Sequence, residues 1–108
     1  MITNAVVSYQ IKPEVLDQHL QLIEAVFDQL RAEERNDVEY KVMRLDDGVS
    51  FVHIATADTP DGSNPIPQMA AFQEFSKDIG SRVVSPPSAG GGEVIGSYHR
   101  SSPLGVTT

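Results

Sequence analysis

Apolar and polar residues alternate in the first segment of the chain and then recur with a helical period. In residues 5–11 every second position, beginning at Ala5 and ending at Ile11, is apolar, which is typical of a half-buried β-strand. From Pro13 to residue 35 the apolar positions are three or four residues apart, with acidic residues early and arginines late, which predicts an amphipathic helix. The apolar stripe of this helix is Leu16, Leu20, Ile23, Phe27 and Leu30.

Two further apolar segments predict a β-hairpin. Residues 38–45 and 49–57 have strand composition, and the turn sequence 46–48 between them ends in Gly48, which can adopt the left-handed conformation of such a loop. Residues 58–67 contain three prolines and a glycine, so they cannot continue the strand and predict a long loop. A lid over a pocket and a simple surface excursion are both open interpretations of this loop.

The last part of the chain predicts one more helix and one more strand. A second helical stripe should stop at Gly80, residues 85–92 should break the chain, and residues 93–100 should form the last strand. We expect residues 101–108 to be a flexible tail after a single domain of residues 1–100. The apolar stripe of the second helix is Met69, Phe72, Phe75 and Ile79.

The element order β, α, β, β, α, β predicts an α+β fold. It is the ferredoxin-like βαββαβ arrangement, in which both helices cover one face of an antiparallel four-stranded sheet. The other face of the sheet remains uncovered, and the chain contains no spare element to cover it. We therefore expect a homodimer, in which a second copy of the chain covers this face.

The pairing register of the hairpin decides which face of the sheet carries His53. A three-residue loop at 46–48 pairs Lys41 with His53 and leaves an almost wholly apolar set for the core. A two-residue loop would pair Val42 with His53 and mix polar and apolar residues on both faces, so we favour the first register. It places Lys41, Met43, Phe51 and His53 on the helix-free face beside Asn4 and Ser8, and Val38, Tyr40, Val42, Val52 and Ile54 on the helix-covered face.

Composition and charge narrow the classes of partner. The formal net charge is −7 and the lysines and arginines are scattered, which argues against binding to nucleic acid or to anionic membranes. The sequence has no cysteine, and none of its three histidines has the spacing of a metal-ligand pair, so we expect no metal and no cofactor. No apolar run is long enough to cross a membrane, and we expect a cytoplasmic protein.

The segments "YKVMRLDDGVSFVHIATA", "FQEFSKDI" and "EVIGSYHR" together resemble the dimeric α/β barrel superfamily, whose best-known branch is the antibiotic biosynthesis monooxygenase-like proteins. The resemblance implies a homodimer in which two sheets pack face to face. Members include cofactor-free oxygenases of polyphenols, haem-degrading enzymes, isomerases and stress-responsive proteins. Asn4 could match an asparagine of the family pocket, but this chain lacks the tryptophan and the histidine of the second helix that often accompany it. In several relatives the pocket lies between sheet and helices, where Tyr9, Tyr40 and Ile54 would line it.

His53 is the candidate catalytic residue, since an imidazole in a pocket could transfer a proton as a general base. The competing interpretation is a neutral imidazole that is hydrogen-bonded at a dimer interface. We expect His19 to be solvated at the edge of its helix stripe and His99 to be exposed. Two functions stay open, a monooxygenase-like enzyme that binds a small apolar or aromatic molecule and a non-catalytic assembly module. The candidate substrate-binding residues are Asn4, Ser8, Tyr40, Phe51 and Tyr98.

Overall fold

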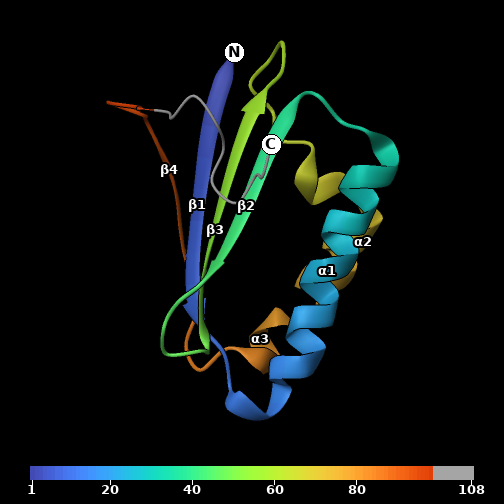
Figure 1. The fold of residues 1–108 in the computed structure, drawn as a ribbon, viewed down its shortest axis with the longest axis vertical. Helices are drawn as coiled ribbons and strands as arrows, with labels where there is room; N and C mark the ends of the chain where they lie inside the picture. The colour runs from blue at the N-terminus through green and yellow to red at the C-terminus, as the bar shows by residue number, and fades with distance from the viewer. Residues whose placement is uncertain (99–108) are drawn as a thin grey trace, which may run out of the picture.

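The computed structural model describes residues 1–98, so the predictions for His99 and for the tail 101–108 lie outside the described residues. The chain order of its elements follows the predicted βαββαβ plan, with short 3₁₀ turns η1 and η2 ahead of the helices (Figure 1). The elements are β1 (Ile2–Gln10), η1 (Pro13–Val15), α1 (Leu16–Glu33), β2 (Val38–Arg44), β3 (Ser50–Asp58), η2 (Ile66–Gln68), α2 (Ala70–Lys77), α3 (Ile79–Arg82) and β4 (Ser88–Gly92).

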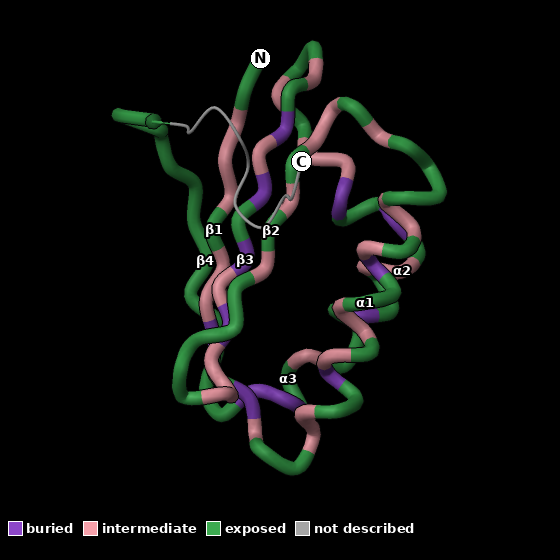
Figure 2. The backbone as a smooth tube through the Cα atoms, viewed as in Figure 1, coloured by how far each residue is buried: buried purple, intermediate pink, exposed green. Residues whose placement is uncertain are grey.

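The four strands form one antiparallel sheet in the order β2-β3-β1-β4. Figure 1 shows the sheet nearly edge-on, with α1, α2 and α3 all on the same side of it. The predicted α+β, ferredoxin-like fold is therefore confirmed. Buried positions concentrate on the helix-facing side of the sheet and on the inner sides of the helices (Figure 2). No helix within residues 1–98 is both long and apolar enough to cross a membrane.

The predicted register of the β2–β3 hairpin is wrong. Val42, and not Lys41, lies opposite His53, and Lys41 lies opposite Ile54. As a result Phe51, His53, Ala55 and Ala57 face the helices, while Val52 and Ile54 face the uncovered side.

A longer turn explains this register. The backbone N–H of Leu45 donates to the carbonyl of Ser50 at 2.8 Å, so the loop comprises residues 46–49. The carboxylate of Asp47 accepts hydrogen bonds from the backbone N–H groups of Val49 (2.9 Å) and Ser50 (2.8 Å). Gly48 has φ +80°, the left-handed conformation predicted for it. An Asp that satisfies two successive N–H groups stabilises one particular loop length, and the loop length sets the register.

The C-terminal elements also differ from the prediction. The chain is helical past Gly80: after a break at Asp78, α3 continues to Arg82. The last strand within residues 1–98 is β4, in the stretch predicted to be a break, and residues 93–98 form no strand. β4 pairs antiparallel with β1 through its backbone, which requires no apolar side chains and so accommodates glycines.

We expect Asp47→Ala to lower the thermal unfolding midpoint clearly more than Asp46→Ala does. The first change removes the acceptor for two backbone N–H groups of the hairpin loop, whereas Asp46 forms no hydrogen bond with another residue of the described chain. Circular dichroism melting of the two variants measures the difference. Equal midpoints for both variants would show that Asp47 does not hold the loop.

Candidate functional site

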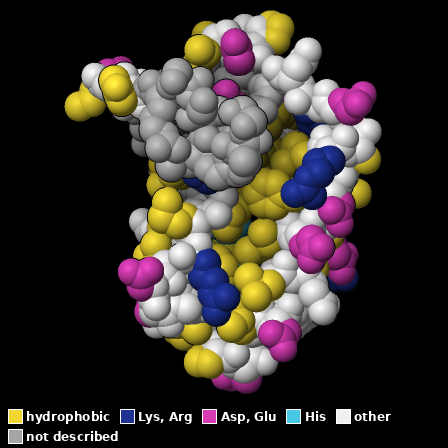
Figure 3. Space-filling view, viewed as in Figure 1, with side chains coloured by type: hydrophobic (Ala, Val, Ile, Leu, Met, Phe, Trp, Pro, Cys, Tyr) yellow, Lys and Arg dark blue, Asp and Glu magenta, His cyan; other side chains and the backbone are white. Residues whose placement is uncertain are grey.

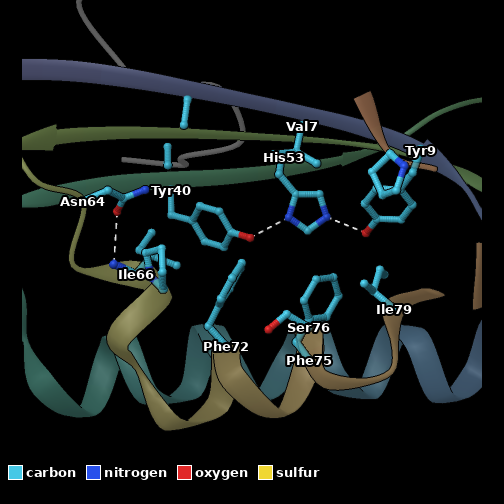
Figure 4. A pocket seen from close by; sticks show the side chains of 14 residues that line it. Val7, Tyr9, Tyr40, His53, Asn64, Ile66, Phe72, Phe75, Ser76 and Ile79 are labelled. Atoms are coloured by element: carbon cyan, nitrogen blue, oxygen red, sulfur yellow. Dashed lines mark hydrogen bonds between the residues drawn. The ribbon is translucent and has the colours of Figure 1, made fainter. Parts of the chain in front are cut away.

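A cavity of about 270 Å³ lies between the sheet and the helices. The strands contribute Tyr9, Tyr40 and His53, and the helical side contributes Phe72 and Phe75, which point toward the strands in Figure 4. Figure 3 shows apolar side chains gathered in the hollow between the two layers. The remaining lining residues are Ala5, Val7, Ala55, Asn64, Ile66, Pro67, Ser76, Ile79 and Pro87.

His53 is held between two tyrosine hydroxyls, one from each neighbouring strand. Its Nε2 lies 2.6 Å from the hydroxyl of Tyr9, and its Nδ1 lies 2.5 Å from the hydroxyl of Tyr40 (Figure 4). The imidazole is only 6% exposed. Since β3 lies between β1 and β2, the observed register brings these three side chains together on the helix-facing side.

His19 extends the same network into α1. It is fully buried, and its Nε2 lies 2.7 Å from the Tyr9 hydroxyl, so that this hydroxyl bridges two imidazoles. The prediction that His19 is solvated is wrong. Helical periodicity placed it at the edge of the apolar stripe, but a histidine can be buried where both ring nitrogens have partners.

The second partner of His19 is Arg82, a residue that the sequence did not single out. Arg82 is 2% exposed, and its Nε donates to Nδ1 of His19 at 3.2 Å. Its guanidinium also donates to the carbonyl of Phe75 and lies over the ring of that residue, 5.2 Å from the centroid. No local pattern indicates this contact, because the two partners are far apart in the sequence.

Burial keeps the two histidines and the two tyrosines of the network neutral at pH 7. Desolvation lowers the pKa of His53 to about 4. Desolvation, followed by the charge of Arg82 and by repulsion between the two imidazoles when both are protonated, lowers the pKa of His19 to about 4. Burial also raises the pKa of both tyrosines, that of Tyr9 with a further contribution from Tyr40. Arg82 is the one cation in contact with these groups among the described residues, and desolvation lowers its pKa.

The structure places two of the predicted site residues, His53 and Tyr40, together in the cavity. Phe51 faces the helices as well and stacks on Tyr9 at a centroid distance of 5.8 Å, but it does not line the cavity. Asn4 and Ser8 lie on β1, on the side of the sheet away from the helices, where Asn4 bonds to Thr56 and Gly92. Tyr98 is 92% exposed.

The resemblance implied a cavity lined by Tyr9, Tyr40 and Ile54. The structure has the two tyrosines there, while Ile54 faces the opposite side of the sheet.

The long loop 58–67 forms one wall of the cavity. Asn64, Ile66 and Pro67 lie in this wall. The hydroxyl of Thr3 on β1 donates to the carbonyl of Gly62 at 2.7 Å, and the hydroxyl of Thr59 donates to the carbonyl of Ser63 at 2.8 Å. These bonds attach the loop to the sheet and to itself. Within residues 1–98, no three His, Asp or Glu side chains cluster as metal ligands.

The arrangement of strands and helices matches that of solved structures. A crystal structure of an antibiotic biosynthesis monooxygenase superimposes with a TM-score of 0.71 at 16% identity, over 89% of this chain and 100% of that chain. The chain has the antibiotic biosynthesis monooxygenase-like fold.

Two further structures with this fold are named as candidate antibiotic biosynthesis monooxygenases. The one from Bacteroides thetaiotaomicron has a TM-score of 0.75 at 8% identity, covering 94% of this chain and 96% of its own. The one from Caulobacter crescentus has a TM-score of 0.71 at 10% identity, covering 88% of this chain and 91% of its own. No protein-family model and no curated protein matches the sequence significantly. The superpositions establish the fold. At identities this low they do not establish the activity, which has to be argued from the cavity.

We expect the stability of the protein to fall between pH 7 and pH 5. The folded pKa values of His19 and His53, about 4, lie below the ordinary 6.5, so the unfolded chain binds more protons in this window. The stabilising effect of the neutral imidazoles is complete above pH 6.5 and is lost as the pH falls toward 4. Each histidine should lower the unfolding free energy by up to about 1.4 kcal/mol per pH unit.

Urea denaturation at pH 7, 6 and 5 measures this slope. His53→Gln should reduce it by about half, because one of the two neutral imidazoles is gone. The carboxylates with lowered pKa values, such as Asp37 and Asp47, titrate below this window and do not contribute. An unfolding free energy that is constant from pH 7 to pH 5 would contradict the buried neutral state.

Proposed function

We propose that the protein is a homodimer that binds a small apolar or aromatic molecule in the cavity beside His53, and that it oxidises this molecule in a monooxygenase-like reaction. The observation that carries the proposal is the cavity itself, an apolar space with a Tyr-His-Tyr group in one wall. Pockets of this kind, mostly apolar with a few convergent polar groups, are the usual sites for small ligands.

The size of the cavity limits the ligand. A cavity of roughly 150 Å³ lined by aliphatic and aromatic side chains is known to accommodate benzene. The present cavity, about 270 Å³, therefore suits a molecule of one or two rings. The rings of Phe72 and Phe75 provide flat apolar surfaces against which such a molecule can stack.

The proposed reaction would use dioxygen as the oxidant. One oxygen atom enters the substrate and the other leaves as water, with the substrate supplying the electrons. His53 and its hydrogen-bonded partner Tyr40 both line the cavity, and this pair is the proposed polar group that meets the reacting oxygen of the substrate. The fold supports this reaction class because structures that share it include one named as an antibiotic biosynthesis monooxygenase.

Dimerisation is supported by the uncovered face of the sheet. Its centre is apolar, since Val6 pairs with Ile54 across β1 and β3 and Met43 pairs with Val52 across β2 and β3. Val6, Met43 and Ile54 are all exposed in the single chain. A continuous apolar strip of this kind on a sheet is a typical subunit contact.

A non-catalytic assembly module is the second candidate function. It is favoured by Val94 and Ile95, which follow β4 and are 66% and 94% exposed. Exposed apolar residues beside a free sheet edge could serve contact with another chain and nothing else.

We expect Ala55→Leu to abolish ligand binding. Ala55 lines the cavity, so a larger side chain there occupies the space that the ligand needs. The control is Ala70→Leu, the same change at an exposed position on α2 outside the cavity. Titration of 1-naphthol, followed by its fluorescence, should show saturable binding to the wild type and to the control only. Absence of saturable binding to the wild type would favour the assembly module.

We expect Ile54→Glu to convert a dimer into a monomer at micromolar concentration. A carboxylate at the centre of the apolar strip would have to be buried without a partner in the dimer. Ala70→Glu adds the same charge on the helical side and should leave the dimer intact. Sedimentation velocity distinguishes the two states, and a monomeric wild type would overturn the dimer proposal.

A further inference from the structure

In the hydrogen-bond network around the cavity, Arg82 determines which group donates and which accepts at each contact. A guanidinium has only donors, so the contact between Arg82 Nε and His19 Nδ1 makes Nδ1 an acceptor. A neutral imidazole with an accepting Nδ1 has its hydrogen on Nε2. His19 therefore donates from Nε2 to the hydroxyl oxygen of Tyr9, 2.7 Å away.

The donor and acceptor of each following contact, from Tyr9 to Tyr40, can then be assigned in turn. The Tyr9 oxygen accepts from His19, and among the described residues Nε2 of His53 is the one acceptor within reach of the buried Tyr9 hydrogen, so Tyr9 donates to it. With Nε2 accepting, His53 has its hydrogen on Nδ1 and donates it to the oxygen of Tyr40. The hydroxyl hydrogen of Tyr40 is left without an acceptor among the described residues, and Tyr40 lines the cavity.

The opposite assignment, with donor and acceptor exchanged at each contact between Tyr40 and His19, is unfavourable. If Tyr40 donated to His53, the chain of bonds would run backwards and would deliver the Tyr9 hydrogen to Nε2 of His19. The same ring would then have no hydrogen to donate to Tyr9 and would have to accept at both nitrogens, which a neutral imidazole cannot do. A protonated ring cannot accept at all, and it would also face the charge of Arg82 at 3.2 Å.

We propose that Arg82, from outside the cavity, fixes Tyr40 as a hydrogen-bond donor, and that the cavity selects a ring compound with an acceptor oxygen, such as an aromatic ketone. Arg82 is thus a positioning residue that acts through His19, Tyr9 and His53. The inference rests on the proposed function, since it names the class of molecule that the same cavity takes.

Asn64 at the wall of the cavity agrees with this preference. Its side-chain oxygen accepts from the backbone N–H of Ile66 at 3.0 Å, which leaves its amide N–H groups for a ligand. Ser76 is exposed, and its hydroxyl donates to the carbonyl of Gln73 at 3.3 Å. Both buried or half-buried groups that remain open toward the cavity, Tyr40 and Asn64, are therefore donors.

The first test reads the tautomers directly in the intact protein. Imidazole ¹⁵N chemical shifts at pH 7.5 should show His19 with its hydrogen on Nε2 and His53 with its hydrogen on Nδ1. In Arg82→Met the fixed acceptor state of His19 is lost, so His53 should become a mixture of both tautomers. His53 with its hydrogen on Nε2 in the wild type would overturn the inference, whether or not the variant folds.

The second test measures ligand choice. In NMR titrations with 1-tetralone and with tetralin, Tyr40→Phe should weaken binding of the ketone by about 2- to 12-fold, the usual effect of one lost hydrogen bond. The hydrocarbon should bind equally well to both proteins, because it accepts no hydrogen bond. Asn64→Asp keeps the acceptor for Ile66 and removes the amide donor, so it measures how much the Asn64 amide contributes to the affinity for the ketone.

The outcomes separate this inference from the proposed function. If both probes bind and Tyr40→Phe affects them equally, the inference is wrong while the binding function stands. If neither probe binds to the wild type, the proposed function fails, and the ligand preference fails with it. A selective loss for the ketone together with the stated tautomers supports both.

Discussion

The hydroxyl of Tyr9 connects the two layers of this protein. It belongs to β1, the strand beside β3, and lies within hydrogen-bond distance of His53 on β3 and of His19 on α1. Through His19 the same network reaches Arg82 at the end of α3, and through His53 it reaches Tyr40 on β2. Each of these groups is polar and none is fully solvated, so each depends on the next for a partner. The same hydrogen bonds therefore hold the helices over the sheet and set which nitrogen of each histidine carries a hydrogen.

The order of the elements could be predicted from the sequence, because strand alternation and helical stripes are local patterns. The register could not, because it depends on the hydrogen bonds of one side chain in the turn, the carboxylate of Asp47. The sequence argument also assumed that a histidine in a strand belongs on the more polar face. His53 contradicts this assumption, since two tyrosine hydroxyls meet its hydrogen-bonding needs inside the protein.

The last strand illustrates a different limit of sequence patterns. The residues of β4, Ser88–Gly92, have almost no side chains that favour a strand, and residues 93–98, the described part of the more strand-like segment after them, form none. β4 exists because the free edge of β1 offers it backbone partners, which is a tertiary effect. For the candidate site, the pattern indicated His53, whereas Tyr9 and Tyr40 came from the family resemblance. Arg82 gave no signal at all, because its importance arises from a contact with a residue 63 positions away.

The neutral state of the two histidines and the two tyrosines limits the kind of chemistry that the cavity can support. A general base with a pKa of about 4 is poorly matched to remove a proton from a weakly acidic ring compound at pH 7. A fixed donor has a different use, because it stabilises the negative charge that develops on an oxygen atom as the compound loses a proton. Tyr40 is such a donor, and its hydrogen bond would strengthen as that charge grows. In an oxidation in this cavity, Tyr40 therefore has the larger role, and His53 holds the Tyr40 hydroxyl in position. The preferred substrate is one whose oxygen already accepts the hydrogen bond from Tyr40 before the reaction begins.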